Sequence, residues 1–473
     1  SKGMKLRAEP SYGKTFEVSQ TVSSLDYLET ESFEFAGEVD SYRNFSGAAH
    51  VFDKRLSSET GAAIFANYKW NNGYYRQINY TPYASAIQKT VTHGYSSEYG
   101  PEQTTSWPGY EGMTNLISER FNKRQPGFVD YVDVNGHLTR IQKVLEQGVP
   151  QVDIAMLRTD YYLNNLLTGV SNAGAYTNRL HQNKAYYWTD LELQNAGYTY
   201  EYFSPLILDD QVDDTDVFTV KDNMLNADGV AYKAVVVMQN ELPLAAAQQL
   251  LKFAQAGLPV IFANNVIEDT NNDHVLKENT IAGSTTGSND GKDAELAEVV
   301  EQIKALPNVK TVESPADAYE ALQELKVNPR AKYGESNAKL LTNMRKDGDA
   351  TYLYVYNYMY EDKENYVGDI TVEGVYQPYL LDTWSGNVTK VTDAFSTADA
   401  GSEQAPKDVT PSGAAKGTTT LSIDLAPGDV AVYILDPTGA AIKEQDAAKT
   451  YDISLSKWNL SVDSYTPGEK VER

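Results

Sequence analysis

Short apolar runs alternate with amphipathic stretches in the first part of the chain, a pattern that predicts β/α units. The strand-like runs cover residues 4–9, 25–29, 55–59 and 89–93, and a glycine or proline follows each of them. Helical stretches lie between them, near 16–24, 41–51 and 82–87. A clearer helix, with apolar residues at 138, 141, 144 and 145, ends at Gly148. Four such units are half of a (β/α)8 barrel, which typically needs about 250 residues.

The pattern changes twice further along the chain. Residues 149–335 alternate buried-strand runs at 152–157, 234–238 and 259–263 with amphipathic helices at 244–256 and 296–303, which predicts a Rossmann-like, doubly wound α/β domain. This part has no glycine-rich phosphate motif after a strand, so we expect a structural role for it. Residues 336–473 carry short alternating runs at 351–356, 370–375, 421–425 and 430–435, which predict an antiparallel β-sandwich. The expected domains are therefore 1–148, 149–335 and 336–473.

Composition excludes several classes of function. Among 473 residues, 65 are acidic and 40 basic, and a net charge of -25 argues against nucleic acid or an anionic membrane as a partner. No apolar run is long enough to span a membrane. The absence of cysteine excludes disulfides, thiolate catalysis and cysteine-bound zinc. The sequence also has no phosphate-binding loop, zinc-peptidase motif or serine nucleophile motif.

Carboxylates stand where the strand-like runs end. Glu9, Glu29, Glu31 and Glu59 all lie at the junction of a predicted strand with its following loop. In a β/α barrel this end of the strands is the catalytic face. Pairs of carboxylates there perform glycoside hydrolysis, because one protonates the leaving oxygen and the other activates water or attacks the anomeric carbon. Each glutamate taken alone is equally compatible with a surface position or a helix cap.

Aromatic residues flank the same face. Trp70 follows the run that contains Glu59, while His93 ends the next run and precedes Trp107. Flat rings beside carboxylates suit pyranose binding, so we expect these three residues to contact a sugar. The alternative is that the two tryptophans pack under loops and that His93 is a buried, hydrogen-bonded histidine. An acidic run at 209–216 lacks the spacing of a calcium loop and is expected to be solvated.

The order of several motifs resembles a known family. The motifs are Arg7-Ala8-Glu9-Pro10-Ser11-Tyr12-Gly13, Leu28-Glu29-Thr30-Glu31, Ser57-Ser58-Glu59, His93-Gly94-Tyr95, Trp107-Pro108-Gly109, the segment 119–126 and Asp382-Thr383-Trp384. Together they resemble the large bacterial α-L-rhamnosidases of glycoside hydrolase family 106 and their actinobacterial relatives. The resemblance implies that the four strands are the second half of the barrel. The family's first motif carries glutamine where this chain has Glu9, which bears on the sugar that the site accepts.

The resemblance also implies roles for particular residues. Glu59 takes the place of the general base, Glu31 that of a carboxylate contacting sugar or calcium, and His93 that of a sugar contact. The family is thought to invert the anomeric centre with the assistance of Ca²⁺. Its general acid lies on an earlier strand, so here we expect it on an N-terminal portion, present as a separate polypeptide, that completes the barrel. An open half-barrel would otherwise expose two strand edges.

The sequence therefore predicts an exo-acting, inverting glycoside hydrolase that removes a terminal L-rhamnose or a related sugar from plant or host glycans. Glu59 is the expected catalytic residue, with Glu9, Glu29, Glu31, Trp70, His93 and Trp107 around the substrate. One alternative is a retaining, β-galactosidase-like enzyme with Glu59 as the nucleophile. Another is a non-catalytic carbohydrate-binding surface protein. An extracellular or cell-surface location in a bacterium is expected in each case.

Overall fold

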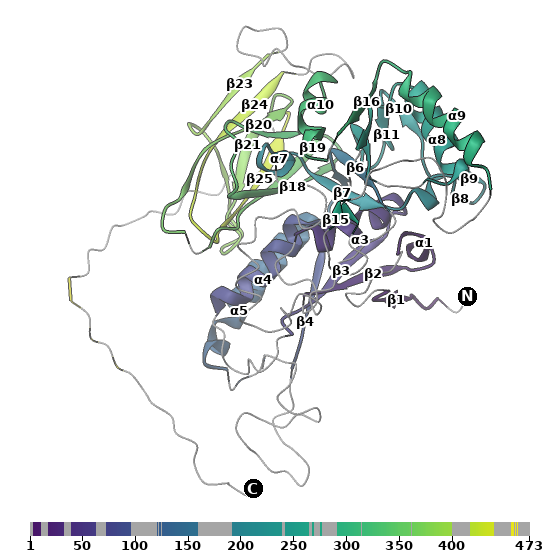
Figure 1. The fold of residues 1–473 in the computed structure, drawn as a ribbon. Coiled ribbons are helices and arrows are strands. Elements are labelled where there is room, and N and C mark those ends of the chain that lie inside the picture. Colours follow the sequence, from purple (N-terminus) through teal and green to yellow (C-terminus); the bar gives the residue numbers. More distant parts are fainter. Residues whose placement is uncertain are drawn as a thin grey trace, which may run out of the picture.

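The computed structural model describes the following residues: 3–10, 18–32, 39–62, 72–95, 121, 123, 125–158, 192–238, 242–263, 267–268, 275–276, 291–313, 315–360, 362–399, 417–438, 456, 457, 459 and 461. These residues form a parallel sheet near the N-terminus, a second parallel sheet, and two antiparallel sheets formed mainly by the C-terminal part. Figure 1 shows the parallel sheets and the antiparallel sheets as neighbouring layers, with helices between them. The predicted mixed α/β architecture is confirmed.

The N-terminal sheet has four parallel strands in the order β1-β2-β3-β4. Strands and helices alternate as β1 (Arg7–Ala8), α1 (Ser19–Val22), β2 (Tyr27–Glu31), α3 (Val39–Val51), β3 (Arg55–Thr60), α4 (Asn72–Ala84) and β4 (Lys89–Thr92). A 3₁₀ turn, η2 (Pro126–Asp130), leads into α5 (Tyr131–Leu145). Among the described residues β1 and β4 do not pair with each other, so the sheet is open.

The second sheet has five parallel strands in the order β16-β13-β12-β6-β7. Its strands are β6 (Ile154–Leu157), β7 (Tyr200–Phe203), β12 (Ala234–Val237), β13 (Val260–Ala263) and β16 (Val309–Val312). The helices that accompany it are α7 (Glu192–Asn195), η3 (Pro205–Ile207), α8 (Leu244–Gln255), α9 (Asp293–Lys304), η4 (Pro315–Asp317) and α10 (Ala318–Glu324). The three strands β6, β12 and β13 are buried along their whole length, which explains their unbroken apolar runs.

Three two-stranded sheets decorate this region. They pair β8 (Gln211–Val212) with β9 (Thr215–Asp216), β10 (Val220–Lys221) with β11 (Met224–Leu225), and β14 (Ile267–Glu268) with β15 (Val275–Leu276). The acidic run at 209–216 thus includes an exposed hairpin, with Asp213 and Asp214 in the turn between its strands and Asp216 on β9.

Two antiparallel sheets form the sandwich. One has the order β17-β20-β24-β23 and the other β22-β21-β25-β19-β18-β5. Their strands are β5 (Val149–Gln151), β17 (Ala331–Tyr333), β18 (Leu340–Asp347), β19 (Ala350–Asn357), β20 (Tyr366–Glu373), β21 (Gln377–Leu381), β22 (Val388–Lys390), β23 (Phe395–Ala398), β24 (Thr418–Leu425) and β25 (Val430–Asp436). The strand β5 pairs with β18 and so joins the sandwich, although the sequence places residues 149–151 in the middle domain.

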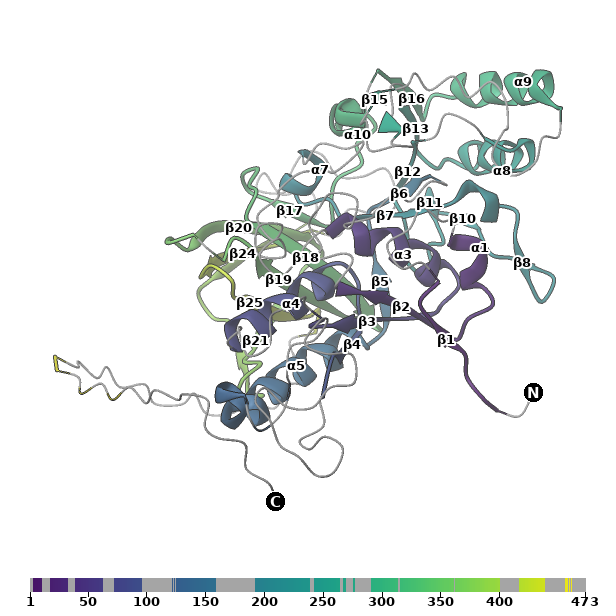
Figure 2. The same cartoon turned by 60° about the horizontal axis from the view of Figure 1, so that its bottom comes forward.

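Helices α4 and α5 join the N-terminal sheet to the sandwich. Figure 2 shows the two helices side by side, and both contribute to one apolar cluster with the sandwich. The hydroxyl of Tyr354 donates to the carbonyl of Tyr80 at 3.2 Å, and the amide of Asn343 donates to the carbonyl of Tyr83 at 2.8 Å. Tyrosine suits this interface because its ring packs while its hydroxyl satisfies a buried carbonyl.

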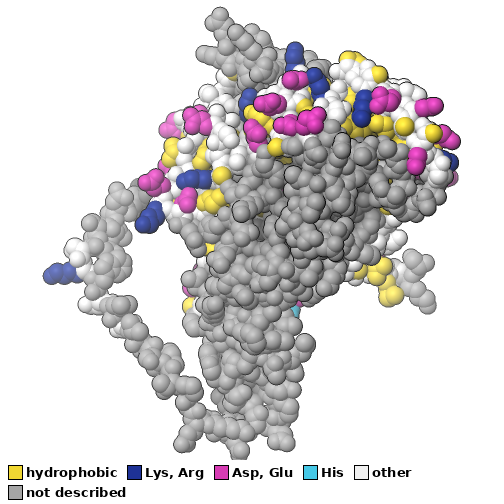
Figure 3. Space-filling view, viewed as in Figure 1, with side chains coloured by type: hydrophobic (Ala, Val, Ile, Leu, Met, Phe, Trp, Pro, Cys, Tyr) yellow, Lys and Arg dark blue, Asp and Glu magenta, His cyan; other side chains and the backbone are white. Residues whose placement is uncertain are grey.

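The acidity of the chain is distributed over its surface. Figure 3 shows acidic side chains spread over the upper face of the view, with lysine and arginine among them. On the described part of this face basic and acidic side chains are interspersed, and such mixing favours solubility. Among the described helices, none combines the length and the apolar composition needed to cross a membrane.

Candidate active site

The N-terminal sheet presents an apolar face to its helices and a polar face on the opposite side. Side chains alternate along a strand, and Leu28 of β2 and Leu56 of β3 belong to the core that α3 covers. Glu29 and Glu31 therefore share the other face of β2. The register pairs Glu29 with Ser57 and Glu31 with Glu59, so Ser57 and Glu59 continue that face on β3.

Three of the predicted carboxylates meet on this polar face. One oxygen each of Glu9, Glu29 and Glu59 lies within 4.8 Å of the other two. The guanidinium of Arg7 contacts the carboxylate of Glu29, and the hydroxyl of Ser57 donates to the same carboxylate at 3.3 Å. Arg7 begins the short strand β1 and Glu9 directly follows it; because β1 pairs in parallel with β2, the register brings these groups together.

Carboxylates this close need a compensating charge. Close carboxylates either share a proton, meet a cationic side chain or hold a metal ion. Arg7 supplies the cation at Glu29. Burial of Glu9, together with the negative charge of Glu59, raises the pKa of Glu9 to about 7, while Arg7 acts in the opposite direction. A proton on Glu9 therefore compensates much of the remaining charge at neutral pH.

Glu59 is more exposed to solvent than Glu29. Its side chain is 29% exposed, against 8% for Glu29. The Nε2 atom of His93, just after β4, lies 3.7 Å from Oε1 of Glu59. This distance is longer than a hydrogen bond and leaves room for the pair to reorganise around a ligand. The structure thus brings His93 to the carboxylate that the sequence selects as catalytic.

The other predicted site residues have different positions. Glu31 is buried at 1% exposure on β2, in register with Glu59 but outside the group of three carboxylates. Trp70 and Trp107 lie outside the described residues, so their contacts with a sugar stay predictions. The structure adds Arg7 as a partner of Glu29, a role that the sequence reasoning missed. The spacing of Arg7 and Glu9 puts both side chains on one face of a strand, so the sequence could have placed Arg7 beside the carboxylates.

Comparisons with known proteins bear on the fold. No family model matches the chain, and no curated protein does. The structure of a rhamnosidase from Novosphingobium sp. PP1Y aligns with 96% of this chain at a TM-score of 0.65 and 14% identity. A GH42 β-galactosidase from G. stearothermophilus, solved as a catalytic mutant, aligns with 91% of this chain and 63% of its own, at a TM-score of 0.45 and 10% identity.

The similarity to the rhamnosidase shows that this chain has a glycoside hydrolase-like fold. The chain spans 39% of that rhamnosidase's length. The expectation of such a fold is therefore confirmed, whereas membership of family 106 stays a prediction.

Proposed function

We propose that this chain carries a catalytic face of a glycoside hydrolase that removes a terminal L-rhamnose or a related sugar from a glycan. The observation that carries the proposal is the position of Glu59. It stands near the carboxyl end of a parallel β-strand, is partly exposed, and belongs to a group of three carboxylates. This end of the strands is where β/α enzymes place their catalytic residues.

In the proposed reaction Glu59 acts as the general base. It takes a proton from a water molecule as the water oxygen forms a bond to the anomeric carbon. The bond from that carbon to the leaving oxygen breaks, and an acid protonates the leaving oxygen. In an inverting enzyme the two carboxyl groups lie about 6.5–9.5 Å apart. Glu9 and Glu29 lie closer to Glu59 than this, so the acid of an inverting reaction comes from another part of the enzyme.

A second candidate has a specific observation in its favour. Retaining glycosidases hold their two carboxyl groups only about 5–5.5 Å apart, and the oxygens of Glu9 and Glu59 approach within 4.8 Å. Glu59 would then attack the anomeric carbon, and Glu9 would protonate the leaving oxygen. The raised pKa of Glu9 suits an acid that must hold its proton near neutral pH.

The open sheet favours a partner that supplies further strands. Leu6 beside β1 is 54% exposed and Val91 on β4 is 36% exposed, although parallel sheets are normally covered. We propose that strands from an N-terminal portion pair with both edges and complete the barrel. The acid of the inverting reaction would lie on those strands.

Binding of Ca²⁺ stays a prediction, because the described carboxylates do not form a set of ligands around Glu31. Glu31, the expected ligand, is not among the three gathered carboxylates, and Arg7 already contacts Glu29. A proton on Glu9 and the guanidinium of Arg7 balance these carboxylates better than a calcium ion would, and the proposed reaction does not require calcium. An extracellular or cell-surface location is likewise part of the proposal.

The stereochemistry of the product tests the proposal. The purified chain, combined with the N-terminal portion that completes the barrel, is incubated with p-nitrophenyl α-L-rhamnoside, and the first-formed sugar is followed by proton NMR before mutarotation. A β-anomer supports Glu59 as a base, and an α-anomer with loss of turnover in Glu9→Gln supports the retaining version. Binding of the glycoside without turnover would favour a carbohydrate-binding protein and overturn the assignment of an enzyme.

A further inference from the structure

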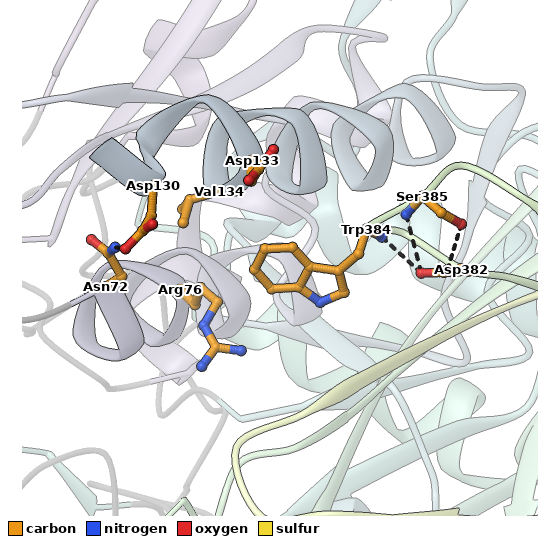
Figure 4. A pocket seen from close by; sticks show the side chains of 8 residues that line it. All are labelled: Asn72, Arg76, Asp130, Asp133, Val134, Asp382, Trp384 and Ser385. Carbon is orange, nitrogen blue, oxygen red and sulfur yellow. Dashed lines mark hydrogen bonds between the residues drawn. The ribbon is translucent and has the colours of Figure 1, made fainter. Parts of the chain in front are cut away.

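A second hollow lies away from the carboxylate group. A groove of roughly 640 Å³ runs between the first turns of α4 and α5 and the turn that follows β21. Figure 4 shows the indole of Trp384 projecting between Val134 of α5 and Arg76 of α4. In a β/α unit a helix begins at the end where the preceding strand finishes. The groove, at the start of α4, therefore opens toward the end of the sheet that carries Glu59.

The indole of Trp384 is held in place on one side. Its ring stacks on the buried ring of His137, with centroids 4.1 Å apart and an angle of 11° between the planes. The Asp382 carboxylate accepts from the backbone N–H of Trp384 at 2.9 Å. Arg140 of α5 donates to the carbonyl of Trp384 at 2.7 Å. The turn is thus fixed to α5, and the ring needs little ordering to receive a ligand.

The same ring is partly open to solvent, with the guanidinium carbon of Arg76 lying over it at 5.6 Å from the ring centroid. Trp384 is 44% exposed, whereas Tyr354 and Leu341 in the adjoining interface between α4, α5 and the sandwich are almost fully buried. A tryptophan that only joined two layers would be covered in the same way. A ligand that covered the exposed part of this ring would remove apolar surface from water, which favours binding.

The groove's other side chains define the ligand's chemistry. The lining includes three carboxylates, those of Asp130, Asp133 and Asp382, and one basic side chain, Arg76, so the groove disfavours phosphates and other anions. Asp130 accepts from the Asn72 amide at 3.2 Å. Asp133 is exposed and makes no hydrogen bond or ion pair with the described residues. A sugar fits both features, since its ring presents a C–H face to an indole and its hydroxyls donate to carboxylates.

We propose that this groove is a second carbohydrate subsite, which stacks a pyranose ring of a neutral glycan on Trp384. It binds a residue other than the one cleaved at Glu59 and so holds a longer glycan on the enzyme. The proposal rests on the proposed function only in that both take a glycan as the ligand. The two sites use different residues, so each can fail without the other.

Affinity electrophoresis in native gels tests the subsite. The probes are galactomannan, xyloglucan and arabinogalactan, each cast separately into a gel, and the unchanged chain is compared with Trp384→Ala, Trp384→Phe, Asp133→Ala and Glu59→Gln. We expect at least one polysaccharide to retard the unchanged chain. Trp384→Ala should weaken the affinity about tenfold, the order expected for the loss of a stacked ring. Trp384→Phe should retain most of the retardation, and Glu59→Gln should retain all of it.

Asp133→Ala controls for a folding defect in Trp384→Ala, because Asp133 is exposed and its removal should leave the fold unchanged. It should weaken retardation at an unchanged melting temperature. The subsite is wrong if no polysaccharide retards the unchanged chain, or if Trp384→Ala and Asp133→Ala migrate as the unchanged chain does. Retardation lost only in Glu59→Gln would likewise exclude the subsite, while leaving the proposed active site in place.

Discussion

Gly47 of α3 lies directly against the backbone of Tyr202 in β7. A Cβ atom added at Gly47 would overlap the Tyr202 carbonyl oxygen and come within 2.8 Å of its carbonyl carbon. This contact lets the helix that covers the N-terminal sheet also pack against the edge of the second sheet. The missing side chain of one residue thus sets how closely the two layers approach.

We expect Gly47→Ala to destabilise the protein despite the better helix propensity of alanine. The neighbouring atoms belong to the backbone and cannot rotate away, so the cost is about 2 kcal/mol, as for overpacked cores. Gly136→Ala in α5 is the matched control, because the nearest atom to its Cβ would be a side-chain nitrogen of Arg140 at an ordinary contact distance of 3.4 Å. That variant should gain roughly 0.5–1 kcal/mol. Melting temperatures that shift equally would contradict this account of the interface.

The buried His137 predicts a loss of stability in mild acid. Burial lowers its pKa to about 4, and the charges of Arg76 and Arg140 add to the effect, while Asp382 opposes it. The hydroxyl of Tyr80 contacts its Nε2 atom. Because the unfolded chain binds this proton near pH 6.5 and the folded chain only near pH 4, stability falls as the pH drops through that window.

The full loss from His137 is about 3 kcal/mol at most. The melting temperature should therefore fall further between pH 7.5 and pH 4.5 for the unchanged chain than for His137→Gln, whose glutamine cannot titrate. Glu9 acts in the opposite direction within an overlapping window, since its pKa is raised, but it is common to both proteins. Equal falls in the two proteins would show that His137 is not held neutral.

The open edge of the N-terminal sheet predicts unequal hydrogen exchange. Strand β3 pairs on both sides, whereas β4 pairs only with β3 among the described residues. Backbone amides of 89–92 should exchange faster than those of 55–60 in the purified chain, because unpaired edges open more readily. A complementing N-terminal portion should slow the exchange of β4. Equal protection in the chain alone would show that its edge is already covered.

The sequence predicts the polar face of the N-terminal sheet because that face depends only on local alternation. Glu29 and Glu59 follow from a period of two residues along predicted strands. The contact of Arg7 with Glu29 depends on the register between strands, which no local pattern states. The start of α4 at Asn72 was also missed, since its first turns are polar and contain no apolar stripe.

Long-range contacts explain the remaining differences. His137 of α5 stacks on Trp384 in a turn of the sandwich. The two residues are far apart in the sequence, so no local pattern predicts that they meet. The short strand β5 has too few residues to show which sheet it joins, and its pairing with β18 decides the matter. The resemblance in the motifs selects Glu59, but only the structure shows which side chains surround it, namely Glu9, Glu29 and His93.

The rate of glycoside hydrolysis in Glu59→Gln is the most direct test of the central claim. The unchanged chain, Glu59→Gln and the control Glu298→Gln, which alters an exposed residue of α9, are each combined with the N-terminal portion that completes the barrel. They are assayed on p-nitrophenyl α-L-rhamnoside and a panel of other aryl glycosides. The account predicts turnover of at least one glycoside, a kcat about 10²–10⁴-fold lower in Glu59→Gln, and no change in Glu298→Gln. Full turnover in Glu59→Gln, or no turnover of any glycoside by the unchanged chain, would contradict it.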